Sequence, residues 1–111
     1  MKNLYEELKR RLAQGFFPDN FLEVARLAEE ASWQTDKPLG LYVLSRVLLS
    51  LSQDWPKQGV ETPVANEMQR VMEPPISAYI SAASGGVSGE QEAQLLNDII
   101  TSYLKWRSNH P

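Results

Sequence analysis

The stretch LGLYVLSRVLLSLSQDW, residues 39–55, decides the fold of this chain. At about 3.6 residues per turn, one broad arc of a helix over this stretch is almost entirely apolar. The arc contains Leu41, Val43, Leu44, Val47, Leu48, Leu51 and Trp55. Tyr42 and Leu49 fall on the opposite side, together with the polar Ser45 and Arg46. A helix that is apolar on more than one face is central in its domain or shared with a partner.

Gly40 lies in the middle of the apolar arc, near the start of this helix. Glycine lowers helix propensity, but its lack of a Cβ atom lets another part of the chain come very close. The sequence therefore predicts a close approach of another backbone at Gly40.

Helical periodicity continues on both sides of the central stretch. It predicts helices over residues 3–14, 20–33, 62–73 and 89–107. Pro74 and Pro75 either end one helix and begin a short one, or kink a single longer helix. No segment alternates as a strand would. The sequence predicts an all-α fold, a compact bundle of five or six antiparallel helices around a central apolar helix at about 39–55.

The helix ends carry local signals. Asn20 with Glu23, and Ser88 with Gln91, match the capping box that begins a helix. Gly15 is expected to end the first helix in the left-handed conformation. The whole chain, residues 1–111, is predicted to be one helical domain, with a flexible loop at about 84–89 and a frayed tail at 108–111.

Composition limits the classes of function. The chain has 42% hydrophobic and 23% charged residues, a net charge of −3 and no cysteine. It therefore carries no disulfide and no thiolate chemistry, and its overall charge does not attract nucleic acid. Polar residues interrupt the central stretch, so a membrane span is not expected. The start, MKNLYEELKRR, lacks the apolar run of a secretory signal, and we expect a soluble cytoplasmic protein.

The sequence offers few groups for catalysis. The only histidine, His110, stands next to the last residue, and no nucleophile motif or cofactor motif is found. We therefore expect no catalytic residue, no cofactor and no metal ligand, and interpret the protein as not an enzyme. The alternative is a small hydrolase or nucleotide-binding protein that uses carboxylates and Mg²⁺, and it depends on two acidic pairs, Asp19 with Glu23 and Glu29 with Glu30.

Two weaker features concern anions and nucleic acid. The loop SGGVSGE before the last helix could hold an anion with its amides, although it lacks the lysine of a phosphate-binding loop. Basic clusters at 9–11 and 105–107 keep a regulator that contacts nucleic acid as a further alternative. Both clusters fall late in predicted helices, where positive charge complements the helix dipole. We expect no nucleic-acid partner and no membrane partner.

The sequence therefore favours a small helical protein that acts through protein–protein interaction or self-association. The partner is another protein or a second copy of the chain, with a homodimer expected. Tryptophans can either anchor an interface or close the end of a small core. The interface candidates are Tyr42, Leu49, Arg46, Trp33 and Trp106.

Overall fold

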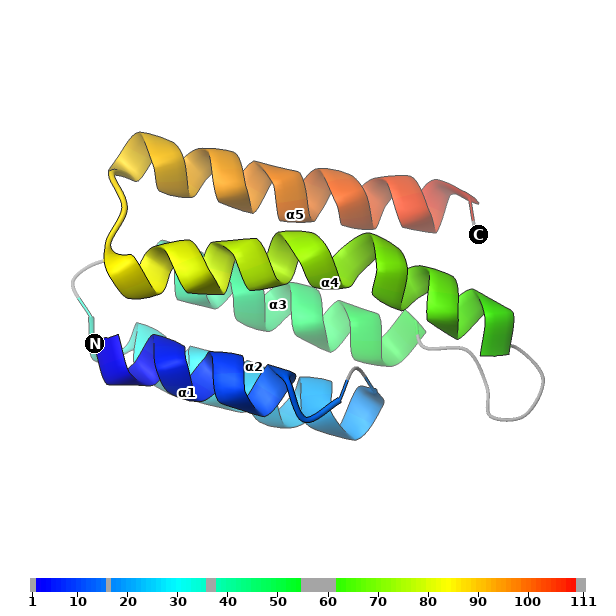
Figure 1. The fold of residues 1–111 in the computed structure, drawn as a ribbon, viewed down its shortest axis with the longest axis horizontal. Coiled ribbons are helices and arrows are strands. Elements are labelled where there is room, and N and C mark those ends of the chain that lie inside the picture. The colour runs from blue at the N-terminus through cyan, green and yellow to red at the C-terminus, as the bar shows by residue number, and fades with distance from the viewer. Residues whose placement is uncertain (1, 16, 36–37, 55–61, 110–111) are drawn as a thin grey trace.

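The computed structural model describes residues 2–15, 17–35, 38–54 and 62–109. Within these ranges the chain forms five α-helices and no strand, which confirms the predicted all-α class. None of these helices combines the length and the hydropathy needed to cross a bilayer. The helices are α1 (Lys2–Leu12), α2 (Pro18–Ser32), α3 (Leu39–Asp54), α4 (Thr62–Gly85) and α5 (Gly89–Asn109) (Figure 1).

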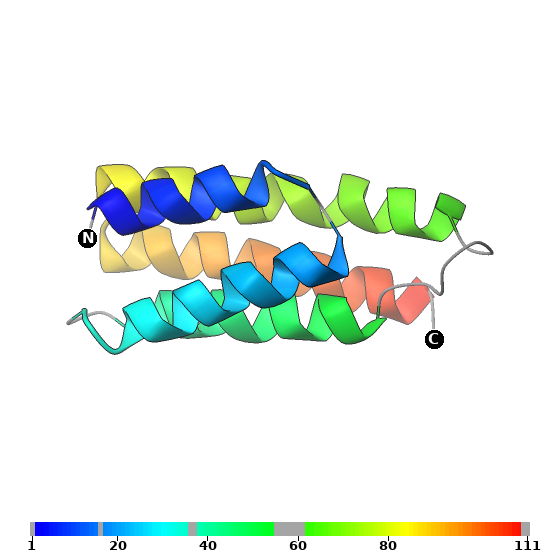
Figure 2. The same ribbon diagram turned by 90° about the horizontal axis from the view of Figure 1, so that it is seen from below.

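The helices form a bundle in which each runs opposite to the one before it in the chain (Figures 1 and 2). Helix α2 packs on α1 and α3, α4 packs on α1 and α5, and α5 also packs on α3. The packed pairs close a ring in the order α1, α2, α3, α5, α4. A ring of five alternating helices must contain one parallel pair, which here is α3 with α5.

Helix α3 buries the arc that the sequence predicts. Leu41, Leu44 and Leu48 are fully buried, whereas Trp55 lies outside the described residues. Ser45 lies opposite the apolar arc and its serine type predicts a hydrated position, which is wrong, because its side chain is buried and its Oγ donates a hydrogen bond to the carbonyl oxygen of Ala25 in α2 at 2.9 Å. The alanine face of α2 lets the two helices come close enough for this bond, so the buried face of α3 is wider than its apolar pattern.

Helix α4 continues through both prolines as one helix, with no break at Pro74, so the described residues form five helices rather than six. A proline inside a helix costs about 3 kcal/mol or more, because it removes a hydrogen bond and crowds the preceding turn. Met72, Ile76 and Tyr79 flank the prolines and are fully buried. Each buried apolar side chain contributes about 1.5–3 kcal/mol, which is enough to keep the helix continuous.

The turn between α1 and α2 differs from the prediction. Helix α2 begins at Pro18, two residues before the expected cap. Asn20 is buried and its Nδ2 donates to the carbonyl oxygens of Arg11 and Gly15, both at 2.7 Å. Asn20 therefore satisfies carbonyl groups at the end of α1 and caps no amide of α2.

Gly15 has no left-handed backbone angle, so its predicted capping role was also wrong. A Cβ atom at Gly15 would lie 2.1 Å from the ring of Phe17, so glycine is needed here because the Phe17 ring packs against its backbone. The capping box at the start of α5 is confirmed, since Gln91 N–H donates to Ser88 Oγ and Ser88 N–H donates to Gln91 Oε1, both at 3.1 Å.

Candidate functional site

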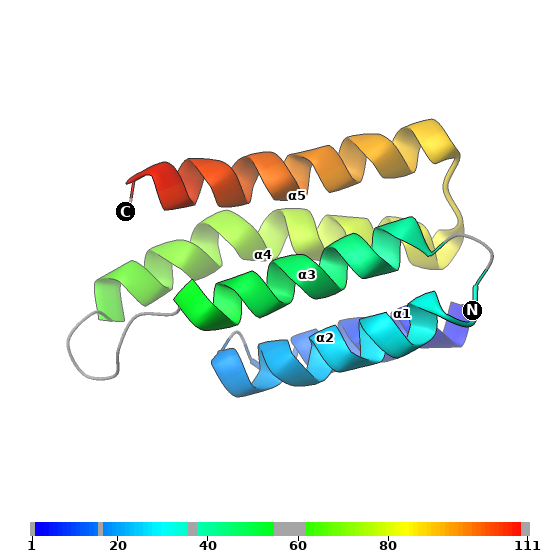
Figure 3. The ribbon, with the colours of Figure 1, turned by 180° about the vertical axis from the view of Figure 1, so that it is seen from behind.

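The end of α2, the start of α3 and the first turn of α5 lie at the same end of the bundle (Figure 3). Residues from these three segments line an open hollow of about 560 Å³. Trp33 is 75% exposed, Leu39 66% and Tyr42 47%, and all three side chains lie on this hollow. Adjacent large apolar side chains that face water make this a candidate interaction surface. We call this site the α2–α3 hollow, and its lining residues are Ser32, Trp33, Pro38, Leu39, Tyr42 and Glu92.

Local backbone structure places these side chains together. Trp33 directly follows α2, and its N–H donates to the carbonyl oxygen of Glu30 at 3.3 Å, so the chain turns at that residue. The carbonyl oxygen of Pro38 accepts from the N–H of Tyr42 at 2.9 Å, which closes the first turn of α3. Leu39 and Tyr42 therefore lie three residues apart on one face of that turn, next to the indole of Trp33.

The polar side of the hollow is formed by Glu92, in the first turn of α5. The hydroxyl of Tyr79, a fully buried residue of α4, donates to Glu92 Oε2 at 3.3 Å. The side chain of Tyr5 in α1 lies near that of Tyr79 and affects its pKa. The one proton of the Tyr79 hydroxyl is donated to the carboxylate, so Tyr79 orients Glu92.

Gly40 makes room for the hydrogen bond between Tyr79 and Glu92. A Cβ atom at Gly40 would lie 2.1 Å from the Tyr79 hydroxyl and 2.6 Å from Glu92 Oε2. The predicted close approach at Gly40 is confirmed, but the prediction that a backbone makes it was wrong, because two side chains do so. Glycine is therefore needed at the point where α3, α4 and α5 meet.

Electrostatics keep both hydroxyls protonated. Burial raises the pKa of Tyr79 well above its ordinary value, and the neighbouring Tyr5 and Glu92 raise it further. Burial and then the charge of Glu92 also raise the pKa of Tyr5. Both tyrosine hydroxyls therefore remain neutral at physiological pH.

The charge of Glu92 is not neutralised by a cation within the described part of the chain. Of the lysine and arginine side chains described there, none forms an ion pair with Glu92. The hollow thus combines exposed aromatic rings with a positioned carboxylate.

The structure brings together two of the predicted interface residues, Trp33 and Tyr42. Arg46 is exposed one turn further along α3 and does not line the hollow. Leu49 is partly buried against the core, because α2 and α5 flank α3 on two sides, so the sequence overestimated its exposure. Trp106 is only 5% exposed and belongs to the core, so it closes the end of the core and does not offer an interface.

The sequence analysis missed Leu39 and Glu92. Leu39 begins the decisive stretch but falls outside its apolar arc, and this position was a signal of exposure. Glu92 had no local signal, because its importance arises from Tyr79 and Gly40, which reach it from other helices.

The acidic pairs of the magnesium alternative lie on the outer surface of α2. Arg26 binds Glu23 at 2.6 Å and Glu30 at 2.8 Å, which accounts for one acid of each pair. Asp19 and Glu29 are exposed. Over the described ranges, no three acidic or histidine side chains come together as ligands for a metal ion.

The first basic cluster is tied to an acid of its own helix. Arg10 and Arg11 both bind Glu7, at 2.6 and 3.3 Å. The hydrogen bonds from Arg10 lower the pKa of Glu7, so the carboxylate stays charged beside them. In the second cluster, Arg107 binds Asp54 of α3 at 3.0 Å. In both clusters, therefore, arginine side chains form ion pairs with acids of the same chain.

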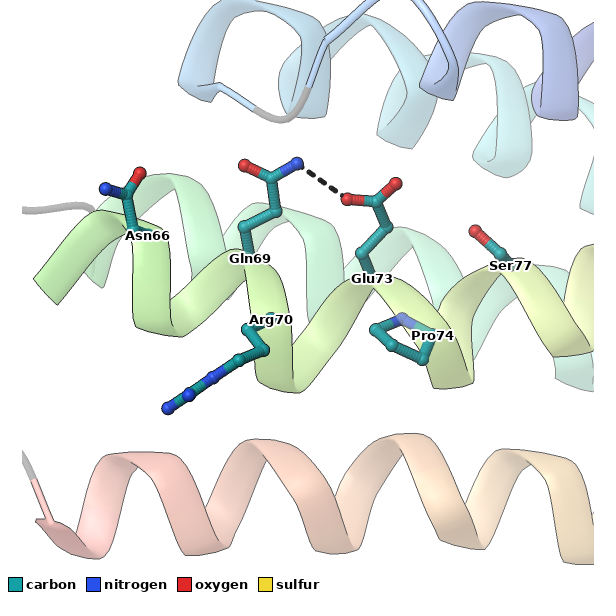
Figure 4. Close-up of a pocket in the computed structure, with 6 residues that line it drawn as sticks. All are labelled: Asn66, Gln69, Arg70, Glu73, Pro74 and Ser77. Carbon is teal, nitrogen blue, oxygen red and sulfur yellow. Dashed lines mark hydrogen bonds between the residues drawn. The ribbon is translucent and has the colours of Figure 1, made fainter. Parts of the chain in front are cut away.

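A second hollow, of about 610 Å³, lies along α4 (Figure 4). Its described lining comes from one helix only, and Gln69 donates to Glu73 at 2.7 Å within it. Arg70 points away from those two side chains in Figure 4. This polar surface gathers no convergent groups from other helices, and the lining residues are Asn66, Gln69, Arg70, Glu73, Pro74 and Ser77.

Comparison of the chain with protein-family models, with curated proteins and with solved structures gave no match. The functional argument therefore depends on the geometry of the chain itself. That geometry favours the α2–α3 hollow, where three helices place exposed apolar side chains around a fixed carboxylate.

Proposed function

We propose that this protein is a non-enzymatic helical module that acts by docking on another protein, or on a second copy of itself, through the α2–α3 hollow. The observation that carries the proposal is the exposure of Trp33, Leu39 and Tyr42 around one hollow. The absence of cysteine agrees with the reducing cytoplasm, which is the location we propose.

The composition of the hollow is that of a binding hot spot. Tryptophan and tyrosine are enriched among the residues that dominate binding energy, since they bury a large apolar area with few rotatable bonds. Covering apolar surface contributes about 25 cal/mol per Å², so the two rings and Leu39 supply a useful driving force. The carboxylate of Glu92 at the edge adds direction to a contact that would otherwise be purely apolar.

The experiment compares two single variants with a matched control. Trp33→Ala and Leu39→Ser remove apolar surface from the hollow. Leu104→Ser removes an equally exposed leucine, 59% against 66%, from α5 outside the hollow. All three should remain folded, because the replaced side chains face water, and circular dichroism checks this.

Tagged wild-type protein and the variants are then compared for the proteins they retain and for their own sedimentation. The proposal expects a retained partner, or a dimer, that is weakened at least about tenfold by Trp33→Ala and Leu39→Ser, and little by Leu104→Ser. If the wild type stays monomeric and every variant retains the same proteins in the same amounts, the proposal is wrong.

A further inference from the structure

We infer that the α2–α3 hollow receives an arginine side chain from a partner protein, with apolar residues beside it. This inference rests on the proposed function and names the chemistry of the partner. It combines three observations, which are the position of Glu92, the exposed rings of Trp33 and Tyr42, and the other end of α3.

The carboxylate of Glu92 already has one hydrogen-bond donor within the chain. The Tyr79 hydroxyl donates to one of its oxygens, Oε2, at 3.3 Å, and Tyr79 itself is fully buried. The other oxygen, Oε1, has no hydrogen bond from a described residue. A carboxylate with one oxygen fixed and the other open is a ready acceptor for a guanidinium N–H.

The opposite end of α3 shows the same arrangement in completed form. There, the Tyr103 hydroxyl donates to Asp54 at 2.5 Å, just as Tyr79 donates to Glu92. Arg107 adds a cation, with Nη1 at 3.1 and 3.0 Å from the two carboxylate oxygens. Glu92 lacks the corresponding cation among the described residues, so we assign that place to an arginine from the partner.

The aromatic rings distinguish arginine from other cations. A planar guanidinium can stack on a tryptophan or tyrosine ring while its edge donates to a carboxylate, whereas an ammonium is a compact and strongly hydrated charge. The aliphatic part of an arginine side chain can lie along Leu39, which is 66% exposed on the same hollow. Apolar neighbours on the partner would cover the remaining apolar surface.

Among the described residues, acidic charges outnumber basic ones close in sequence to the hollow, which favours a basic partner over an acidic one. Glu29 and Glu90 are exposed close in sequence to Trp33 and Glu92. The one exposed cation described there, Arg46, lies a turn along α3 from the hollow. An acidic segment would be repelled there, and a purely apolar segment would leave Glu92 covered without a cation, which is costly.

The test uses a matched pair of probes, the tripeptide Ac-Leu-Arg-Leu-NH₂ and the same peptide with citrulline, which has nearly the same shape but no charge. Each is titrated into the full-length protein while NMR follows the Trp33 indole N–H and the Gly40 amide. We expect the arginine peptide to shift both signals and to bind at least about tenfold more tightly than the citrulline peptide.

Two carboxamide variants locate the charge. Glu92→Gln should abolish the preference for arginine over citrulline, whereas Glu90→Gln, on the same turn of α5 but outside the hollow, should keep it. Raising the salt concentration should weaken the arginine peptide and leave the citrulline peptide nearly unchanged, and this measurement needs no variant. Trp33→Ala should weaken both peptides.

The outcomes separate this inference from the proposed function. Equal binding of the two peptides, or tetramethylammonium binding as tightly as the arginine peptide, overturns the arginine assignment. Loss of a natural partner or dimer in Trp33→Ala, without any response to the arginine peptide, also overturns it, while leaving the docking function intact. A dimer that Glu92→Gln dissociates and Glu90→Gln does not would overturn a separate partner in favour of a second copy.

Discussion

A hydrogen bond from a tyrosine hydroxyl to a carboxylate lies near each end of α3, but only one of the two carboxylates also has an arginine partner among the described residues. At the end of the helix, Asp54 accepts from Tyr103 and is neutralised by Arg107, both from α5. Near its start, α3 packs against Glu92, which accepts from Tyr79 and has no cation among the described residues. The molecule is elongated, at 42 × 24 × 19 Å, and the two carboxylates lie toward its opposite ends. Asp54 is paired with an arginine, and Glu92 is not paired with a cation among the described residues.

The difference between the two ends is that one uses its charges within the fold and the other leaves a carboxylate without a cation among the described residues. Helices α3 and α5 are parallel neighbours that α4 separates in the chain, so they need specific contacts to hold their alignment (Figure 3). The Asp54 cluster supplies such a contact and uses its charges fully. Around Glu92 the fold leaves charge and apolar surface available, at a position that buried groups have already fixed.

The largest effect on stability should come from Gly40→Ala, which adds a methyl group in the packed space beside Tyr79 and Glu92. The new Cβ atom would lie 2.1 Å from the Tyr79 hydroxyl and 2.6 Å from Glu92 Oε2, so both side chains must move. Overpacking and a lost hydrogen bond should lower the free energy of unfolding by about 2–4 kcal/mol, despite alanine's better helix propensity. Urea unfolding measures the loss.

Gly85→Ala is the control for this substitution. Gly85 is also helical, and a Cβ atom there meets nothing within 4 Å. This variant should be unchanged or more stable by up to about 1 kcal/mol. If the two variants behave alike, Gly40 is not required by the packing of Tyr79 and Glu92.

The next effect concerns alkaline pH. The pKa of Tyr79 is raised by folding, so above about pH 10 the unfolded chain releases this proton while the folded chain keeps it. Stability that is complete below about pH 10 is then lost as the pH rises, by up to about 1.4 kcal/mol per pH unit for one tyrosine.

Tyr79→Phe removes this contribution. At pH 7, where the hydrogen bond to Glu92 is intact, the wild type should have a higher free energy of unfolding than Tyr79→Phe. This difference should shrink between pH 10 and pH 12. Tyr103→Phe should change the pH slope less, because Arg107 opposes the rise in the pKa of Tyr103 that burial and Asp54 cause. Equal slopes for the two variants would show that the two ends do not differ in this respect.

At the satisfied end, Asp54→Ala should cost about 1 kcal/mol, since it removes an acceptor from Tyr103 and the partly exposed ion pair with Arg107. Glu92→Gln should cost less, because the amide oxygen still accepts from Tyr79 and no ion pair within the described chain is lost. Thermal unfolding of both variants at pH 7 measures this contrast. A greater loss for Glu92→Gln would reverse our assignment of the two ends.

The fold was predictable to a large extent because local periodicity carries it. The buried arc of α3 follows from spacing alone, and the box of Ser88 and Gln91 follows from four consecutive residues. The errors at Ser45 and Asn20 share one cause, since each polar side chain found its partner on another helix. A pattern within one segment cannot show a carbonyl oxygen on the next.

The candidate site was predictable only in part for the same reason. Trp33 and Tyr42 stood out by residue type and by their place on a helix. Glu92 did not, because a glutamate in the first turn of a helix is ordinary, and only the contacts from Gly40 and Tyr79 make it unusual. Long-range contacts, more than residue types, therefore determine which acid of the chain could act.

The smallest effect on stability should come from Trp33→Ala, and its smallness is informative. With 75% of its surface exposed, Trp33 contributes little to the core, so the free energy of unfolding should change by less than about 0.5 kcal/mol. Trp106→Ala, which empties a buried position, should unfold at clearly lower urea concentration and serves as the control. A large indole that stability does not need, held beside a fixed carboxylate, is what a docking surface requires. A loss above about 1 kcal/mol in Trp33→Ala would instead make Trp33 part of the fold, and the open end would then resemble the closed one.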